Sequence, residues 1–376
     1  MLRIAGTPCA TMLAATAGAM WLLLSPASGV PSQPPAGSEA LGRIIDEVVT
    51  EGPACAGLAI GVEQRNMRVQ RFYGDTGRHG RPNADSEFEI GSITKTLTAT
   101  VLAYEDQQGA IRMNDPLAHF APAGMRVPDF YGQQILMLHL ATHTSGLPRG
   151  VPVFNPPLMP EAMWRFVSSY QLQRPPGAQF LYSNLGFALL ARAISRRETL
   201  TEDQLYARII TQPLGMHDTA ISLSSAQRVR LAQGYGADGQ PVREGAPGFP
   251  AMAGAGAAHS TLNDMMRYLD FQLGRLSVPL TSLLPVLHQP RHAAGPNGRV
   301  GLGWQMNQQP VEVISKGGAT RGFSSFIVFA PASRSGVVIL SNQARCPVAK
   351  MGFRIIAILN GSNVNAPELP AAGDEN

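Results

Sequence analysis

Lysine is scarce in this chain of 376 residues. Three of its 30 Lys and Arg residues are lysines: Lys95, Lys316 and Lys350. The remaining Lys and Arg positions are all arginine. A lysine amine can lose its proton when it is poorly hydrated, whereas a guanidinium stays charged in proteins. The scarcity therefore directs attention to what these three amines do.

Long apolar runs are missing from all but the N-terminus. Arg3 precedes an apolar stretch at 10–24, and Pro26 and small residues follow up to Gly29. This order is typical of a secretory signal peptide, and the run is short for a membrane span. We predict a signal peptide at 1–29 and a Pro-rich linker at 30–38; an uncleaved anchor is the alternative.

Cysteine and metal-binding motifs are also sparse. Cys9 lies before the apolar stretch, which does not fit a lipid-anchored cysteine. Cys55 and Cys346 remain after signal cleavage, and export would permit a disulfide, although the sequence leaves their separation open. The eight His residues show no His-Glu-x-x-His pattern and no clustered spacing, so no metal or cofactor is expected.

The sequence has no long cluster of residues with the same charge. Apolar residues make up 44% and charged residues 15%, which is typical of a globular protein. The net charge of +4 comes from scattered arginines with no interleaved aromatic stripe, so we expect no nucleic-acid partner. A solvated basic surface, mildly attracted to an anionic envelope polymer, is the simpler interpretation.

Strand patterns lie near both ends of the chain, and helical patterns lie between them. Strands are expected at 57–62, 67–74, 311–315, 325–330 and 336–341, and helices at 39–51, 93–108, 262–272 and 348–359. The predicted fold class is α+β, with an antiparallel sheet built from both chain ends and flanked by helices. The sheet domain would comprise residues 39–115 and 296–361. A mostly helical domain would comprise residues 116–295, and residues 362–376 would form a disordered tail.

The stretch "EIGSITKT" places Ser92 and Lys95 at the start of the predicted helix 93–108. Three-residue spacing puts both side chains on one face, where the helix N-terminus offers free N–H groups to an oxyanion. A poorly hydrated Lys95 could then accept the proton of Ser92. This pattern alone is unspecific, because Ser at a helix start is commonly a cap and lysine scarcity can reflect genome composition.

Two further stretches raise the specificity. "YSN" at 182–184 follows a Pro-Pro-Gly turn and precedes an apolar helix, and Lys316-Gly317-Gly318 ends a predicted strand. A strand edge of this kind can bind a ligand backbone. Ser-x-x-Lys, a Ser-Asn-type triplet and a Lys-centred triplet, in this order, are the signature of penicillin-recognising serine enzymes. The Gly-x-Ser-x-Gly elbow of other serine hydrolases is absent.

On these motifs the chain resembles the class C β-lactamase-like serine hydrolases over most of residues 40–360. Within them it is most similar to the AmpH-type D-alanyl-D-alanine carboxypeptidase/endopeptidases. The resemblance rests on "GSITKTLTA", "MNDPLAHFAPAGMRVP", "LATHTSGLPR", "YSNLGFALL", "PLGMHDT", "HSTLNDMMRYL", "GLGW" and "KGGATRGF". It implies a β-lactamase/transpeptidase-like fold, with an active site between the sheet and the helical region.

The resemblance also implies residue roles. Ser92 would be the acylated nucleophile, and Lys95 and Tyr182 would share the proton transfers. Lys316 would favour the anion of Tyr182 and bind the substrate carboxylate. Asn184 would hydrogen-bond the substrate amide and Lys95. The expected enzyme is periplasmic, without a stable membrane anchor, and acts on peptidoglycan stem peptides or β-lactams.

The third triplet departs from the family pattern. It usually reads Lys-Thr-Gly or His-Thr-Gly, whereas this chain has Gly317 in place of Thr. The lost hydroxyl would weaken carboxylate recognition, which Thr320 or Arg321 could restore. The backbone N–H of Ala319 would still complete an oxyanion hole. The sequence thus leaves three hypotheses: a DD-peptidase with weak β-lactamase activity, an esterase of the same fold, and a penicillin-binding receptor without turnover.

Overall fold

The computed structural model describes residues 36–151, 158–243, 250–296, 298–307 and 311–362. The predicted signal peptide at 1–29 and all but the first residue of the predicted tail at 362–376 lie outside these residues. The described residues belong to one compact unit, which begins at Ala36. Helix α1 (Ala36–Thr50) begins three residues before the helix predicted at 39–51, within the predicted linker 30–38. The Pro-rich stretch stops at Pro35, so the next residues are free to form the first helical turn.

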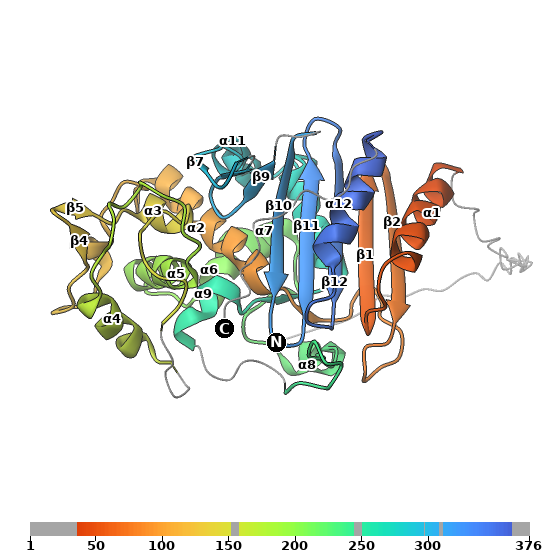
Figure 1. The fold of residues 1–376 in the computed structure, drawn as a ribbon, viewed down its shortest axis with the longest axis horizontal. Helices are drawn as coiled ribbons and strands as arrows, with labels where there is room; N and C mark the ends of the chain where they lie inside the picture. The colour runs from red at the N-terminus through yellow and green to blue at the C-terminus, as the bar shows by residue number, and fades with distance from the viewer. Residues whose placement is uncertain (1–35, 152–157, 244–249, 297, 308–310, 363–376) are drawn as a thin grey trace, which may run out of the picture. The chain divides into compact units, whose positions relative to one another are not determined.

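An antiparallel sheet is the centre of this unit (Figure 1), and its strand order among the described residues is β2-β1-β12-β11-β10-β9-β8-β7. The strands are β1 (Gly57–Gln64), β2 (Met67–Gly74), β7 (His292–Ala293), β8 (Gly298–Val300), β9 (Gln305–Asn307), β10 (Val313–Ala319), β11 (Ser324–Ala330) and β12 (Ser335–Ser341). Early β1 pairs antiparallel with late β12. The predicted sheet from both chain ends is confirmed.

Two strand predictions need correction. The strand expected at 311–315 begins at Val313 and continues to Ala319, so Lys316 lies within β10 and not at its end. Gly317 and Gly318 concealed this continuation, because glycine has low strand propensity. Strands β7 to β9 were missed altogether, since two or three residues are too few to show alternation.

Helices cover both faces of the sheet. In Figure 1, α1 and α12 (Val348–Leu359) lie across the front, where Ile45 and Ile356 join a core with Phe326 of β11. On the opposite face, α10 (Leu262–Gln272) packs against β1 and β12. Alternate strand residues serve the two cores, as the two-residue period of a strand requires. The α10 and α12 bounds match the predicted helices.

Helices and short strand pairs fill the middle of the chain. They are β3 (Phe88–Glu89) with β6 (His259–Ser260), β4 (Asp129–Phe130) with β5 (Gln133–Gln134), η1 (Gly91–Ile93), α2 (Thr94–Gln108), η2 (Leu117–Phe120), α3 (Met137–Ala141), α4 (Pro160–Ser169), α5 (Asn184–Glu198), α6 (Glu202–Tyr206), the π-helical turn η3 (Ala207–Thr211), α7 (Gln212–Leu214), α8 (Ser225–Arg230), η4 (Pro250–Met252), α9 (Ala253–Gly256), η5 (Pro279–Leu283) and α11 (Leu284–Leu287). The domain boundaries proposed from the sequence stay a prediction, and α10 shows that segment 116–295 also contributes to the sheet's cover. Within the described residues, no helix combines the length and apolarity needed to cross a membrane.

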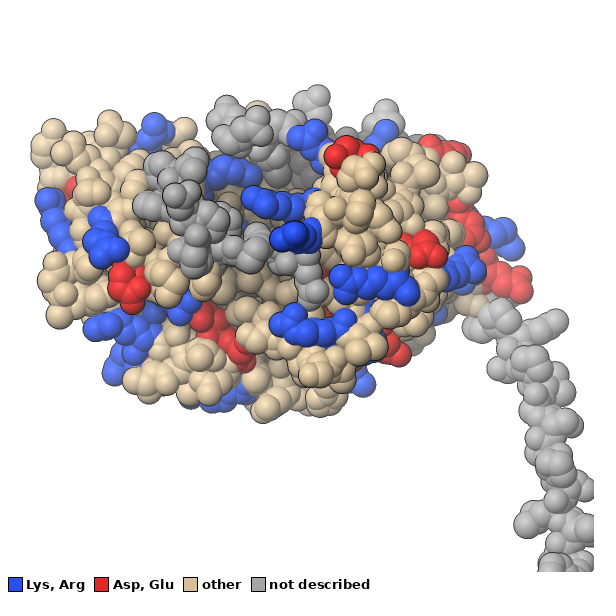
Figure 2. All heavy atoms as spheres, turned by 90° about the horizontal axis from the view of Figure 1, so that it is seen from below, with Lys and Arg blue, Asp and Glu red and all other residues tan. Residues whose placement is uncertain are grey.

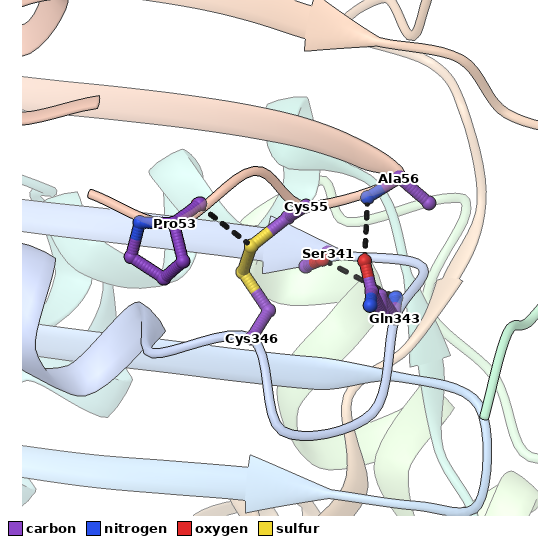
Figure 3. Close-up of a disulfide and its surroundings, with 6 residues drawn as sticks. All are labelled: Pro53, Cys55, Ala56, Ser341, Gln343 and Cys346. Carbon is purple, nitrogen blue, oxygen red and sulfur yellow. Dashed lines mark hydrogen bonds between the residues drawn. A yellow bond between two sulfur atoms is a disulfide. The ribbon is translucent and has the colours of Figure 1, made fainter. Parts of the chain in front are cut away.

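A disulfide ties the two ends of this unit together. Cys55 precedes β1, Cys346 follows β12, and the two are bonded with a Cα–Cα distance of 5.8 Å (Figure 3). Beside it, the side-chain oxygen of Gln343 accepts a 2.7 Å hydrogen bond from the N–H of Ala56. The pairing that the sequence left open is thus formed, and it closes a loop of 291 residues in sequence.

Charged side chains of both signs are interspersed on the surface. Figure 2 shows Lys and Arg spread over one face, with Asp and Glu between them. Arg68 of β2 joins Glu63 of β1 at 2.7 Å and Asp270 of α10 at 2.6 Å, and Arg275 also contacts Glu63. The Arg68–Asp270 pair links β2 to α10, and a partly exposed pair of this kind contributes little to stability.

Candidate active site

Ser92 lies in the tight turn η1, directly before helix α2, and is partly exposed. The turn is held from two sides. The N–H of Ile90 donates to the carbonyl of Ala258 at 2.9 Å, and the hydroxyl of Ser325 on β11 donates to the carbonyl of Ile90 at 2.8 Å. Helix and sheet therefore fix the position of the Ser92 hydroxyl.

Gly91 allows this turn to approach strand β10 closely. Its φ is +48°, and a Cβ atom there would lie 2.7 Å from the backbone nitrogen of Ala319. The N–H of Thr320 donates to Phe323 on the β11 side. Because N–H groups alternate sides along a strand, the N–H of Ala319 points the other way, towards η1. With the N–H of Ser92 at the start of the helix, it forms a pair of donors suited to an oxyanion.

Lys95 is wholly buried on the first turn of α2. Its Nζ atom lies 2.9 Å from Oγ of Ser92 and donates to the carbonyl oxygen of Ala255 at 2.6 Å. Burial lowers the pKa of the Lys95 amine well below its usual value, and the charge of Arg149 adds to this. A neutral amine in this position can accept the Ser92 proton.

Tyr182 approaches Ser92 from the segment just before α5. Its hydroxyl donates to Oγ of Ser92 at 2.9 Å. The Nζ atoms of Lys95 and Lys316 lie 5.1 and 5.2 Å from the centre of the Tyr182 ring. The structure thus brings one hydroxyl, one phenol and two amines from three separate parts of the chain into one cluster.

Lys316 is 2% exposed, and its ammonium group makes no hydrogen bond or ion pair among the described residues. Burial lowers its pKa to about 8, with the nearby Tyr182 raising it and Lys95 lowering it. In the sheet register Lys316 pairs with Ile327, so its side chain lies on the same face as Ile327, which packs in one core with Leu97 of α2 and Leu269 of α10. A buried, unpaired cation of this kind is prepared for an anionic ligand.

The edge of β10 beside Lys316 is open. Strand β9 pairs only with Val313 to Ser315, so in the described chain residues 316–319 have no strand partner on that side. This free edge faces the turn that carries Ser92. An extended peptide could therefore add to the sheet with its carbonyl carbon beside the nucleophile.

Three predicted binding residues are less well placed. The resemblance implied a hydrogen bond between Asn184 and Lys95, but among the described residues Lys95 bonds only Ser92 and Ala255; Asn184 begins α5 nearby. The hydroxyl of Thr320 is buried and has no hydrogen-bond partner among the residues that the structure describes. Arg321 is exposed and makes no hydrogen bond or ion pair with the Ser92 cluster in the described part of the chain.

The sequence profile of the family described as Beta-lactamase matches residues 45–359. The chain belongs to the β-lactamase family. The resemblance inferred from its motifs is confirmed, and so is the expectation that it is an enzyme, a serine hydrolase of this family. No group of three or more His, Cys, Asp and Glu residues that could hold a metal ion occurs within the described ranges.

Named relatives in the β-lactamase family cover most of the chain. AmpH of Escherichia coli K12, a D-alanyl-D-alanine-carboxypeptidase/endopeptidase, is 33% identical over 340 residues, which are 83% of this chain and 86% of AmpH. A beta-lactamase of Yersinia enterocolitica is 29% identical over 70% of this chain and 76% of its own length. The solved beta-lactamase/D-alanine carboxypeptidase from Yersinia pestis has a TM-score of 0.76 at 29% identity, covering 86% of this chain and all of that one. The α+β fold class is confirmed.

Sequence reasoning missed two residues that surround Tyr182. The ring of His143 stacks on the ring of Tyr182 with centres 4.2 Å apart, and its Nδ1 atom accepts the N–H of Ser183 at 3.1 Å. Burial lowers the pKa of His143 well below its usual value, and Lys316 and Lys95 add to this, so the ring stays neutral. Arg149 lies on the exposed side of the same ring. "LATHTSGLPR" carries both, but only contacts across the fold distinguish them from structural residues.

Proposed function

We propose that this chain is an exported DD-peptidase, which removes terminal D-alanine from peptidoglycan stem peptides through an acyl-enzyme on Ser92. β-Lactams, which are acylating agents, would react with the same serine, with slow hydrolysis as a side activity. The observation that carries the proposal is the contact of Ser92 Oγ with both Lys95 Nζ and the Tyr182 hydroxyl, each at 2.9 Å.

In the proposed first step, Ser92 attacks the carbonyl carbon of the scissile bond. The Ser92 proton passes to the Lys95 amine, and the carbonyl oxygen becomes an oxyanion between the N–H groups of Ser92 and Ala319. As the C–N bond breaks, the leaving amine takes a proton that is relayed through the Tyr182 hydroxyl. An acyl ester on Ser92 remains.

The second step reverses the roles. Water attacks the acyl ester and gives its proton to the Lys95 and Tyr182 pair, and Ser92 Oγ leaves with a proton from the same pair. The carboxylic acid product then dissociates. His143 stays neutral beside the pair, so it adds no third buried charge that would oppose protonation of Lys95.

Lys316 and the free edge of β10 favour a peptide with a terminal carboxylate. The ammonium group of Lys316 is buried and unpaired among the described residues, so a substrate carboxylate would supply its missing partner. Arg321 is exposed in the turn after β10, and its guanidinium would donate further hydrogen bonds to the same substrate carboxylate. Asn184 would hold the amide on the other side of the scissile bond.

Export to the periplasm would place the enzyme beside this substrate. The disulfide between Cys55 and Cys346 supports an oxidising compartment, since disulfides are rare in reducing ones. The charged, apolar and small-residue order of 1–29 supports the same route. AmpH, the 33% identical relative, is named for the corresponding activity.

An ester substrate is the second candidate, and one observation favours it. Gly317 removes the hydroxyl expected at the third triplet, and the hydroxyl of Thr320, the candidate replacement, is buried. An esterase does not have to bind a carboxylate on its leaving group. The same Ser92 chemistry would then act on short acyl esters.

Release of D-alanine decides between the two. The mature protein is incubated with a D-Ala-D-Ala-ending muropeptide and, separately, with a butyrate ester, and Ser92→Ala is the control. Ser92-dependent release of D-alanine is expected. Its absence, together with fast ester hydrolysis, would replace the peptidase proposal by the esterase. A stable acyl adduct without product would support a receptor.

A further inference from the structure

Arg149 is the most exposed of the three cations beside the Tyr182 ring. Its guanidinium carbon lies 5.2 Å from the centre of the Tyr182 ring, while Lys95 and Lys316 near the same ring are buried. Arg149 makes no ion pair with any described residue. An exposed cation that borders a catalytic hydroxyl is available to a charged group on the substrate.

The backbone of Arg149 is fixed by hydrogen bonds, whereas its side chain forms no hydrogen bond or ion pair among the described residues. Its carbonyl oxygen accepts the N–H of Asn184 at 2.7 Å and of Leu185 at 3.3 Å, at the start of α5. The hydroxyl of Ser183 also donates to the carbonyl of Pro148 at 2.7 Å. The loop 147–149 is thus tied to the segment that positions Tyr182, so the guanidinium starts from a defined point.

The position of Arg149 identifies the side of the scissile bond that it would meet. It is bonded to Asn184, on the helical side of the cluster, whereas Lys316 and Arg321 belong to β10 and the turn after it. If Lys316 holds the carboxylate of the leaving group, Arg149 lies by the other part of the substrate, the acyl donor. The two cationic ends would then bind two different anionic groups.

We propose that Arg149 selects substrates whose acyl-donor part carries a free carboxylate. This rests on the proposed acyl transfer at Ser92. The planar guanidinium can take a carboxylate through two parallel hydrogen bonds, which a lysine at this position could not do. The ligand class is a peptide or ester with an anionic side group on its acyl side, and neutral acyl donors bind less well.

The test compares two substrates that differ only in this charge: glutaryl-D-Ala-D-Ala and pentanoyl-D-Ala-D-Ala, which have acyl chains of equal length. The ratio of their kcat/KM values is measured for the wild type, Arg149→Ala, Arg149→Lys and Arg149→Glu. A ratio cancels any common effect of Arg149 on Lys95. Arg43→Ala is the control, because Arg43 is exposed on α1 and has the same charge.

The wild type is expected to prefer the glutaryl peptide, and Arg149→Ala should lower this preference by roughly threefold to tenfold, as expected for an exposed charge pair. The loss should appear in KM, since the contact is present before and during the reaction. Arg149→Lys should keep part of the preference. Arg149→Glu should prefer a 5-aminopentanoyl peptide, and Arg43→Ala should behave as wild type. A ratio that is the same in the wild type, Arg149→Ala and Arg149→Glu would overturn the proposal.

A different result would show that the peptidase proposal is wrong while leaving the Arg149 proposal open to test. In that case the wild type cleaves neither peptide, and the same comparison is made with p-nitrophenyl esters of glutaric and pentanoic acid. An Arg149-dependent preference for the glutaryl ester would support the acyl-side site while excluding the peptide substrate. Equal ratios for all variants on the esters would overturn the Arg149 proposal independently.

Discussion

The Nζ atom of Lys95 lies 2.9 Å from Oγ of Ser92, and no part of the Lys95 side chain reaches solvent. A second buried lysine, Lys316, lies on the same Tyr182 ring. Burial lowers the pKa of both amines. A guanidinium cannot be tuned in this way, which explains why a chain that otherwise uses Arg has lysines at these two positions.

The rate of acylation should depend on pH as a bell-shaped curve. It should rise as Lys95 loses its proton, at a pH well below the usual lysine value, because only the neutral amine accepts the Ser92 proton. It should fall above about pH 8, where Lys316 becomes neutral and no longer holds an anion. Stopped-flow acylation by a chromogenic cephalosporin from pH 5 to pH 10 measures both limbs, and a rate that still rises at pH 10 would contradict the role of Lys316.

Lys316→Arg separates this limb from general alkaline inactivation. The guanidinium stays charged over the whole range, so the alkaline limb should move upward by at least about one pH unit. The rate below pH 8 will fall, since the longer fork fits the buried site less well. An unchanged limb would assign it to another group.

Lys95→Met should abolish acylation and stabilise the fold. The pKa of Lys95 is lower in the folded than in the unfolded chain, so the unfolded chain binds more protons between the two values. The free energy of unfolding therefore decreases as the pH falls from the pKa of Lys95 in the unfolded chain towards its pKa in the folded chain. Removing the amine should raise the free energy of unfolding by about 1–2 kcal/mol at pH 7. Urea unfolding at pH 7 and above pH 10.5 tests this, and the gain should disappear at the higher pH.

Gly317 and Gly318 should respond differently to substitution. A Cβ at Gly317 would meet only Phe326, at 3.7 Å, whereas a Cβ at Gly318 would lie 2.1 Å from the carbonyl oxygen of Ile90. Gly317→Thr should fold and add a hydroxyl beside the strand edge. It should raise kcat/KM for a D-Ala-D-Ala peptide over its terminal amide by about threefold, the value of one neutral hydrogen bond.

Gly318→Ala is the matched control for that substitution. It should lower the melting temperature and reduce acylation, because the turn before Ser92 has to move away from β10. Equal melting temperatures for the two variants would show that the close approach of Ile90 to β10 is not required.

The disulfide should stabilise the fold without taking part in catalysis. Cys55→Ser with Cys346→Ser should lower the free energy of unfolding by about 2–4 kcal/mol, since the bond closes a very long loop in the unfolded chain. Penicillin acylation of the folded variant should stay within about twofold of wild type. Thermal unfolding with and without reductant provides the comparison, and identical curves would mean that the bond does not constrain the unfolded chain.

The sequence predicted the sheet from both ends because β1, β2, β11 and β12 are long enough to show their pattern. It predicted Ser92, Lys95 and Lys316 because lysine is scarce and a three-residue spacing fixes a helix face. Lys316 was still placed at a strand end, since the glycines after it resemble a turn.

The remaining site residues depend on contacts that no local pattern records. His143 is stacked on Tyr182 from 39 positions earlier in the chain, and Arg149 approaches the same ring from a loop. The Ala319 N–H is directed at the nucleophile only because Gly91 lets the turn come close. These contacts depend on how α2, α5 and β10 pack together, and the spacing of residues along the sequence does not predict that packing.

The most direct test of the central claim is intact-mass spectrometry of the mature protein after incubation with penicillin. The account predicts a mass increase of one penicillin in the wild type, and none in Ser92→Ala or in Lys95→Arg, in which the charge is kept but no neutral amine is available. An adduct of normal yield and rate in folded Lys95→Arg would contradict it.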